Sequence, residues 1–178
     1  MTTHGYSPHS PTASPRGHWD APVADAPLDA TVTVPGSKSL TNRELILAAI
    51  ADGPGMLHAP LHSDDSARMV EALRTLGVGI EEVPTDSPFG PDLLVTPAMT
   101  LRGDTTVDCG QAGTVMRFVA PLAGLARGDV LVTAHESALH RPMGAMISAL
   151  REVGVDIDDG GHWSLPFSVR GHGHVRGG

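Results

Sequence analysis

Apolar and polar residues follow two different periods along this chain, and the two alternate from about residue 30 to residue 170. A period of two marks strands, and a period near 3.6 marks helices. In the first half these patterns predict strands at 30–34, 78–80 and 92–96 and helices at 42–51 and 68–76. In the second half they predict strands at 105–109, 130–133, 155–157 and 167–170 and helices at 114–126 and 142–153. Helices that alternate with short strands indicate an α/β domain.

The two halves of the chain resemble each other. Segments 36–43 and 110–117 both place an arginine seven residues after a glycine, at an offset of 110 − 36 = 74. Segment 69–80 aligns without a gap with 146–157, at an offset of 146 − 69 = 77. Matches in the same order and at nearly the same offset indicate two copies of one unit. Each copy is predicted to run strand, helix, strand, helix, strand, strand.

The ends of the chain differ from this pattern. Residues 1–28 are rich in proline, serine, threonine and histidine, a composition that predicts a disordered tail. Repeat unit 1 is expected at about 29–102 and repeat unit 2 at about 103–178. Residues 175–177 match 101–103, the place where the second copy begins. We therefore expect a third copy to follow, which would make this chain the N-terminal part of a longer protein.

Composition narrows the class of protein. The formal net charge is −8 and only 3% of residues are aromatic, which argues against nucleic-acid binding through phosphate contacts and base stacking. No segment has the ~20 apolar residues of a membrane span, and no signal peptide is evident. The one cysteine, Cys109, excludes an internal disulfide and is expected to be buried rather than nucleophilic. A cytoplasmic location is expected.

The first glycine loop carries two cations beside a predicted helix start. Thr41 is the expected N-cap, with Glu44 as its capping-box partner. Lys38 would then lie just before the helix and Arg43 in its first turn, where the helix dipole favours anions over cations. Lys38 is also the only lysine of the chain. Either these are solvated surface charges, or a bound anion compensates for their position.

The second copy repeats this arrangement. Gly113 and Thr114 can cradle an anion at the start of the next helix, and Arg117 repeats the position of Arg43. The alternative is that Arg117 pairs with Asp108 or Asp104.

Charged residues also stand before the later helices. Asp64 and Asp65 precede the helix at 68–76, where capping is the favoured role and catalysis the alternative. Arg141 precedes Pro142, the expected first residue of another helix, and its guanidinium suits a carboxylate. Three histidines of a glycine-rich stretch, His162, His172 and His174, have weak metal-ligand spacing and are expected to be loop residues without a metal.

Four motifs, in order, resemble one family. Segments 35–43, 63–77, 108–117 and 140–142 are similar to the N-terminal part of 3-phosphoshikimate 1-carboxyvinyltransferases, or EPSP synthases. The resemblance covers about 30–178 and implies an enolpyruvyl transferase-like fold built of repeated βαβαββ units. Three such units form each domain of the family, so this chain would contain two of three.

The resemblance also implies a function. Family members transfer the enolpyruvyl group of phosphoenolpyruvate to the 5-hydroxyl of shikimate 3-phosphate, without a metal or organic cofactor, and the full-length protein is expected to be a monomer. Lys38, Ser39 and Arg43 would bind shikimate 3-phosphate, while Lys38, Gly113 and Arg141 would bind phosphoenolpyruvate. The acid and base of the family lie in a second domain, so these 178 residues alone are expected to bind weakly and to be inactive.

Supporting roles in the same site are expected for Thr114, Arg117 and Asp65. Gln111 stands where the family more often has asparagine. Two alternatives stay open: a UDP-N-acetylglucosamine enolpyruvyl transferase and a non-catalytic anion-binding remnant. The first of these families typically has Lys-Asn where this chain has Lys38-Ser39, and it has a loop cysteine that Cys109 does not match in position.

Overall fold

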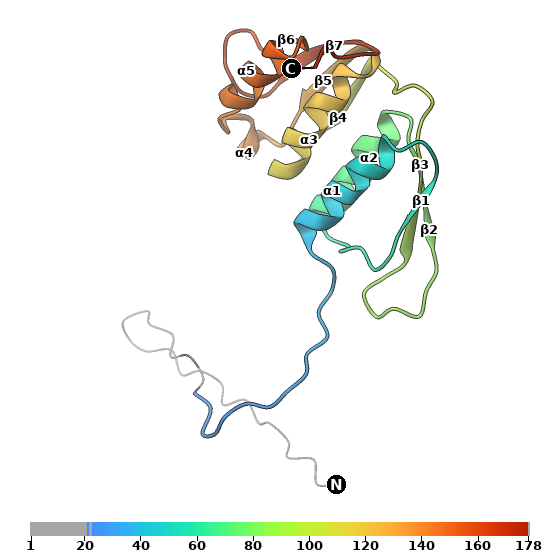
Figure 1. The fold of residues 1–178 in the computed structure, drawn as a ribbon. Helices are drawn as coiled ribbons and strands as arrows, with labels where there is room; N and C mark the ends of the chain where they lie inside the picture. Colours follow the sequence, from blue (N-terminus) through green and yellow to red (C-terminus); the bar gives the residue numbers. More distant parts are fainter. Residues whose placement is uncertain (1–20, 22, 178) are drawn as a thin grey trace. The chain divides into compact units, whose positions relative to one another are not determined.

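The computed structural model describes residue 21 and residues 23–177. Residues 1–20 and 22 of the predicted tail lie outside the described residues, while residues 21 and 23–28 are exposed and form no helix or strand. Contacts divide the chain into segments 1–33 and 34–178, and every described helix and strand belongs to the second segment (Figure 1).

The first part of segment 34–178 is a helical pair on a three-stranded sheet. Strands β1 (Gly55–Leu57), β3 (Asp92–Thr96) and β2 (Gly79–Val83) lie in that order and are antiparallel. Helices α1 (Lys38–Ala49) and α2 (Asp64–Thr75) pack on this sheet. Alternate residues of β3, Leu93 and Val95, are buried beneath them, as expected of an antiparallel sheet with one covered face.

The second part has a four-stranded sheet in the order β4 (Thr105–Asp108), β5 (Arg127–Thr133), β7 (Phe167–His172) and β6 (Asp156–Asp158). Strands β4 and β5 are parallel, and the other pairs are antiparallel. Helix α3 (Gly113–Gly124) packs on β5 and β7, and α5 (Gly144–Glu152) packs on β6. A short helix, α4 (Glu136–Leu139), follows β5.

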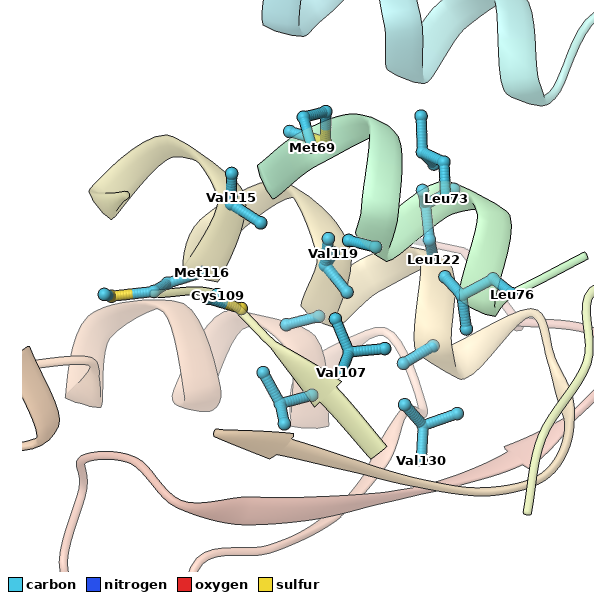
Figure 2. Close-up of a cluster of buried hydrophobic side chains, with 14 of the residues drawn as sticks. Met69, Leu73, Leu76, Val107, Cys109, Val115, Met116, Val119, Leu122 and Val130 are labelled. Carbon is cyan, nitrogen blue, oxygen red and sulfur yellow. The ribbon is translucent and has the colours of Figure 1, made fainter. Parts of the chain in front are cut away.

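The core lies where α2 meets α3. Figure 2 shows side chains of α2 and of the residue after it facing α3, with β4 and β5 below. These side chains are all nearly or fully buried: Met69, Leu73, Leu76, Val107, Val115, Val119, Leu122 and Val130. Burial of each large aliphatic side chain stabilises the fold by about 1.5–3 kcal/mol. This shared core joins the two sheets and holds the starts of α1, α2 and α3 in place.

Equivalent residues of the two halves make equivalent contacts. Arg74 donates to the carbonyl of Ile80 at 2.6 Å, and Arg151 donates to the carbonyl of Ile157 at 2.8 Å. Each residue of the second contact lies 77 positions after its equivalent in the first. The two arginines lie on α2 and α5, and the glycines that follow these helices, Gly77 and Gly154, have positive φ angles of 97° and 92°. A positive φ was expected for Gly77.

The strand predicted at 30–34 is wrong. These residues form no strand, and Val32 and Val34 are 76% and 70% exposed. The corresponding strand β4 is held by its parallel ladder with β5. A β-branched sequence forms a strand only where such a partner is present.

Most other predicted elements are confirmed, with shifted ends. Helices α1 and α2 each begin four residues earlier than predicted, and the strand predicted at 130–133 begins at Arg127. Helix α5 begins at Gly144. The prediction that Pro142 is its first residue is therefore wrong. The predictions contained no counterpart of α4, because four residues are too few to establish a helical period.

Candidate functional site

The first glycine loop leads directly into α1. Ser37 is the N-cap, but its side chain makes no capping hydrogen bond. The predicted N-cap, Thr41, is wrong: this residue is 2% exposed within the helix, and its Oγ1 accepts a hydrogen bond from the N–H of Leu61 at 2.9 Å. The backbone N–H groups of the first turn are therefore not occupied by a capping side chain, which suits an anion.

Lys38 is the first residue of α1 rather than the residue before its cap. Its Nζ lies 3.0 Å from Oδ2 of Asp65, in the first turn of α2. Asp65 is not the cap of α2, because Ser63 and Ser66 form the capping box there. The Asp65 carboxylate is thus free to hold the ammonium of Lys38 near the helix starts.

Arg43 lies beyond the first turn of α1, not within it as predicted. Its Nη1 donates to the carbonyl of Ser39 at 3.2 Å. Its guanidinium carbon lies 5.9 Å from the ring centroid of Phe118 on α3, which is a cation–π distance. Arg43 thus lies along its own helix and against the neighbouring one.

The second glycine loop precedes α3 in the same way. Ala112 is the N-cap and provides no side-chain hydrogen bond. Arg117 donates from Nη1 to the carbonyl of Gly113 at 3.0 Å, which repeats the contact of Arg43 with Ser39. Among the described residues Arg117 pairs with neither Asp108 nor Asp104, so the alternative is wrong; Nη1 of Arg68 lies 3.7 Å from Oδ2 of Asp108.

Arg141 reaches this loop from the chain that follows α4. Its Nη1 donates to the carbonyl of Gln111 at 2.7 Å. A Cβ on Gly113 would lie 3.2 Å from Nη1 of Arg117 and 3.5 Å from Nη1 of Arg141. The two guanidinium groups therefore flank Gly113, and the missing side chain leaves them room.

A hydrogen bond joins the two helices that follow these loops. Nδ2 of Asn42, the fifth residue of α1, donates to Oγ1 of Thr114, the second residue of α3, at 2.8 Å, so the N-terminal parts of α1 and α3 lie side by side. The residues predicted for an anion site are in this way gathered at the starts of three helices: Lys38, Ser39 and Arg43 on α1, Asp65 on α2, and Gly113, Thr114 and Arg117 on α3, with Arg141 beside Gly113.

Sequence reasoning missed two residues of this arrangement. Asn42 and Phe118 contact predicted site residues but were not singled out. A polar residue at a buried position of a helix is a signal for Asn42. Phe118 has no such signal, because its contact with Arg43 depends on the packing of α1 against α3.

A hollow beside the second glycine loop has a different charge from the helix starts described above. It has a volume of about 510 Å³ and is lined by Asp64, Asp65 and Glu71, with Arg68 as its cation, together with neutral residues and His135. Lys38 pairs with Asp65 and Arg68 pairs with Glu71, so among the described residues the lining of this hollow offers an anion no unpaired cation. We therefore place the candidate anion site at the starts of α1 and α3 rather than in this hollow.

Cys109 is fully buried, as predicted. Burial, together with the charge of Asp108, raises the pKa of its thiol to about 12. A thiol with this pKa is not a nucleophile at neutral pH. Within residues 21 and 23–177, no cluster of three or more histidine, cysteine, aspartate or glutamate side chains is arranged to hold a metal ion.

Fold and site together define a class of protein: an α/β protein with cationic side chains near the starts of its helices, where an anion is the candidate ligand. A family model described as EPSP synthase (3-phosphoshikimate 1-carboxyvinyltransferase) matches residues 23–178. The chain belongs to the EPSP synthase family.

Individual relatives agree with this assignment. A curated 3-phosphoshikimate 1-carboxyvinyltransferase of Kocuria rhizophila is 49% identical over 164 residues, which are 90% of this chain and 37% of the relative. Two solved EPSP synthase structures from Acinetobacter baumannii match with TM-scores of 0.67 and 0.68 at 27% and 26% identity. Each match covers 79% of this chain and 32% of the solved chain. The fold is thus enolpyruvyl transferase-like, and this chain spans about a third of the length of these relatives.

Proposed function

We propose that this chain supplies one side of the substrate site of an EPSP synthase. In that reaction the 5-hydroxyl of shikimate 3-phosphate loses its proton to a base and its oxygen bonds to C2 of phosphoenolpyruvate, while an acid adds a proton to C3. Loss of a proton from C3 and cleavage of the bond between C2 and the phosphate oxygen then release phosphate. Membership of the family supports this proposal. The structural observations that carry it are the guanidinium groups of Arg117 and Arg141 that flank Gly113 and the hydrogen bond that joins α3 to α1, the helix that bears Lys38 and Arg43.

Lys38, Ser39 and Arg43 bind the phosphate of shikimate 3-phosphate in this proposal. In the structure, Lys38 is paired with Asp65 and Arg43 with the carbonyl of Ser39. These partially exposed contacts are weak. A phosphate dianion offers both cations stronger, charge-assisted hydrogen bonds, so both contacts can be exchanged for the ligand.

Phosphoenolpyruvate binds beside Gly113. Arg141 holds its carboxylate, because a planar guanidinium can form two parallel hydrogen bonds to that group. The N–H groups at the uncapped start of α3 and the ammonium of Lys38 face its phosphate. Thr114 and Arg117 support the loop, and Asp65 supports Lys38. The chain thus neutralises and orients two anionic substrates, while the groups that transfer protons belong to another part of the enzyme.

We also propose that a third βαβαββ unit covers α1 in the whole protein. Leu40, Leu47 and Ile50 on or next to this helix are 53%, 64% and 50% exposed. The corresponding helix α3 buries most of its side chains between its neighbours. Leu40 and Leu47 share one face of α1, with the exposed Arg43 and Glu44 between them. Exposed apolar side chains on one helix are typical of an interaction surface, so a further unit of the same kind fits it.

A cytoplasmic location is part of the proposal. Buried, reduced Cys109 is compatible with a reducing compartment. Within the described part of the chain, none of the helices is both apolar enough and long enough to cross a membrane.

Titration calorimetry on the 178-residue chain tests this proposal. We expect weak binding of shikimate 3-phosphate and of phosphoenolpyruvate, and no binding of shikimate, which lacks the phosphate. A phosphate-release assay with both substrates is expected to show no turnover. A folded chain that binds neither substrate at millimolar concentration, or that binds UDP-N-acetylglucosamine instead of shikimate 3-phosphate, would overturn the proposal. Phosphate release would show that the proton-transfer groups lie in this chain.

A further inference from the structure

Asn42 has an unusual environment for an amide. It is 0% exposed, and its Nδ2 donates to Oγ1 of Thr114 at 2.8 Å. Its Oδ1 is buried and has no hydrogen-bond partner among the described residues. Because a hydroxyl both donates and accepts, either end of the amide can bond to Thr114, and the other end is then unpaired.

The other half of the chain shows that packing does not require an amide at this position. Asn42 corresponds to Met116, at the offset of the two glycine loops (116 − 42 = 74). Met116 is also 0% exposed and lies in the equivalent helix. An apolar side chain therefore fills the corresponding place in α3. An unpaired buried carbonyl destabilises a fold, so the amide of Asn42 requires another explanation.

The position of its one hydrogen bond supplies that explanation. Asn42 precedes Arg43 in α1, and Thr114 follows Gly113 in α3, so the bond joins the two halves of the proposed substrate site. We propose that Asn42 is a positioning residue: by holding Thr114, it fixes the first turn of α3 against α1 and sets the separation between the Lys38 side and the Gly113 side. This inference rests on the proposed function, because its ligands are the substrates named there.

The two substrates should respond differently to loss of this bond. Asn42 is too deeply buried to touch a ligand, so it acts through the backbone of α3. A tilt of the first turn of α3 moves both Gly113 and Arg117, which are joined by a hydrogen bond. Lys38 and Arg43 stay on α1. We expect about tenfold weaker binding of phosphoenolpyruvate, since small misplacements of binding groups have large effects, and less than about twofold weaker binding of shikimate 3-phosphate.

Four variants of the 178-residue chain separate positioning from stability. Asn42→Met introduces the residue of the other repeat, and Thr114→Val removes the hydroxyl with little change of shape. The double variant tests whether the two act through one bond. Met116→Leu is the matched control, because it changes a buried residue of the same helix pair without touching the bond. Affinities for both substrates are measured by titration calorimetry.

We expect each single variant to weaken phosphoenolpyruvate binding and the double variant to be no weaker than either one. Met116→Leu should bind as the unaltered chain does. Additive losses, or equal losses for both substrates, would show that Asn42 acts only on stability and would overturn the proposal. Unaltered phosphoenolpyruvate affinity in Thr114→Val would also overturn it. If Asn42→Met does not fold, the phosphoenolpyruvate affinity of Thr114→Val alone tests the proposal.

Amide hydrogen exchange provides a readout that needs no ligand. The N–H of Met116 donates to the carbonyl of Ala112 at 3.1 Å and reports on the first turn of α3. Asn42→Met and Thr114→Val should speed its exchange while leaving Val119 in mid-helix unaffected. Equal exchange in all forms would overturn the positioning role. If the unaltered chain binds neither substrate, the proposed function fails, and this exchange result still decides the role of Asn42.

Discussion

Replacing Lys38 with methionine tests the α1 side of the site. The Lys38 and Asp65 side chains are 51% and 26% exposed, with 3.0 Å between the charged atoms. A pair this accessible to solvent contributes at most about 1 kcal/mol to the free energy of unfolding. Methionine and lysine also have similar helix propensities. Lys38→Met should therefore leave the chain folded, with its free energy of unfolding lower by less than about 1 kcal/mol.

The effect on binding should be larger. A hydrogen bond between an ammonium group and a phosphate contributes about 1.5–3 kcal/mol. At 1.4 kcal/mol per factor of ten, the loss corresponds to about 10- to 150-fold weaker binding of shikimate 3-phosphate. Phosphoenolpyruvate should weaken as well, because Lys38 is assigned to both ligands.

Calorimetric titration of both ligands, alongside urea unfolding of the same samples, measures the two effects. Arg102→Met is the control: it removes one positive charge from an exposed residue outside the site. If both variants weaken shikimate 3-phosphate binding equally, the effect comes from net charge alone. Equal weakening, or unchanged affinity in Lys38→Met, would refute the assignment of Lys38 to the phosphate.

Three further predictions concern other parts of the structure. Gly113→Ala places a Cβ 3.2 Å from the guanidinium of Arg117. We expect calorimetry to show about tenfold weaker phosphoenolpyruvate binding, with a melting temperature within a few degrees of that of the unaltered chain. Unchanged affinity would contradict a role for this contact in binding. Burial acts to raise the pKa of Asp159, but hydrogen bonds from Arg151 and from backbone N–H groups outweigh it and lower that pKa. The unfolded chain then binds more protons below about pH 4, so stability should fall with pH there, and urea unfolding of Asp159→Asn should show a weaker fall; an identical acid profile would count against this. With a pKa of about 12, the thiol of Cys109 is ionised in about one molecule in ten thousand at pH 8, so a disulfide reagent should label it only after unfolding, and rapid labelling of the folded chain would exclude such burial.

Hydrophobic periodicity predicted α3 to within two residues because its apolar positions repeat over three turns. It failed where a distant partner decides the structure. Residues 30–34 have the composition of a strand but pair with no neighbouring strand among the residues that the structure describes. Thr41 has the spacing of a cap, with Glu44 three residues later, but its hydroxyl accepts a hydrogen bond from Leu61, 20 residues away.

In the candidate site, too, local spacing predicted some features, and the packing of distant residues determined the others. Repeated glycine and arginine spacing indicated that α1 and α3 each carry cations at their starts. The spacing could not show that Asp65 holds Lys38 or that Arg141 reaches the carbonyl of Gln111, because these contacts depend on how the helices pack. Asn42 was overlooked because an amide beside an arginine is typical of an exposed position, although Asn42 lies three residues before the buried Leu45 on the same helix face.

A chemical-shift titration of the ¹⁵N-labelled 178-residue chain tests most directly whether α1 and α3 form one substrate site. Shikimate 3-phosphate is added first and phosphoenolpyruvate second. We expect the amides of Ser39 and Arg43 to shift with the first ligand and those of Gly113 and Arg117 to shift with the second, each set with one saturation curve. Shifts confined to other surfaces, or no shifts with millimolar ligands, would contradict a substrate site at the starts of these two helices.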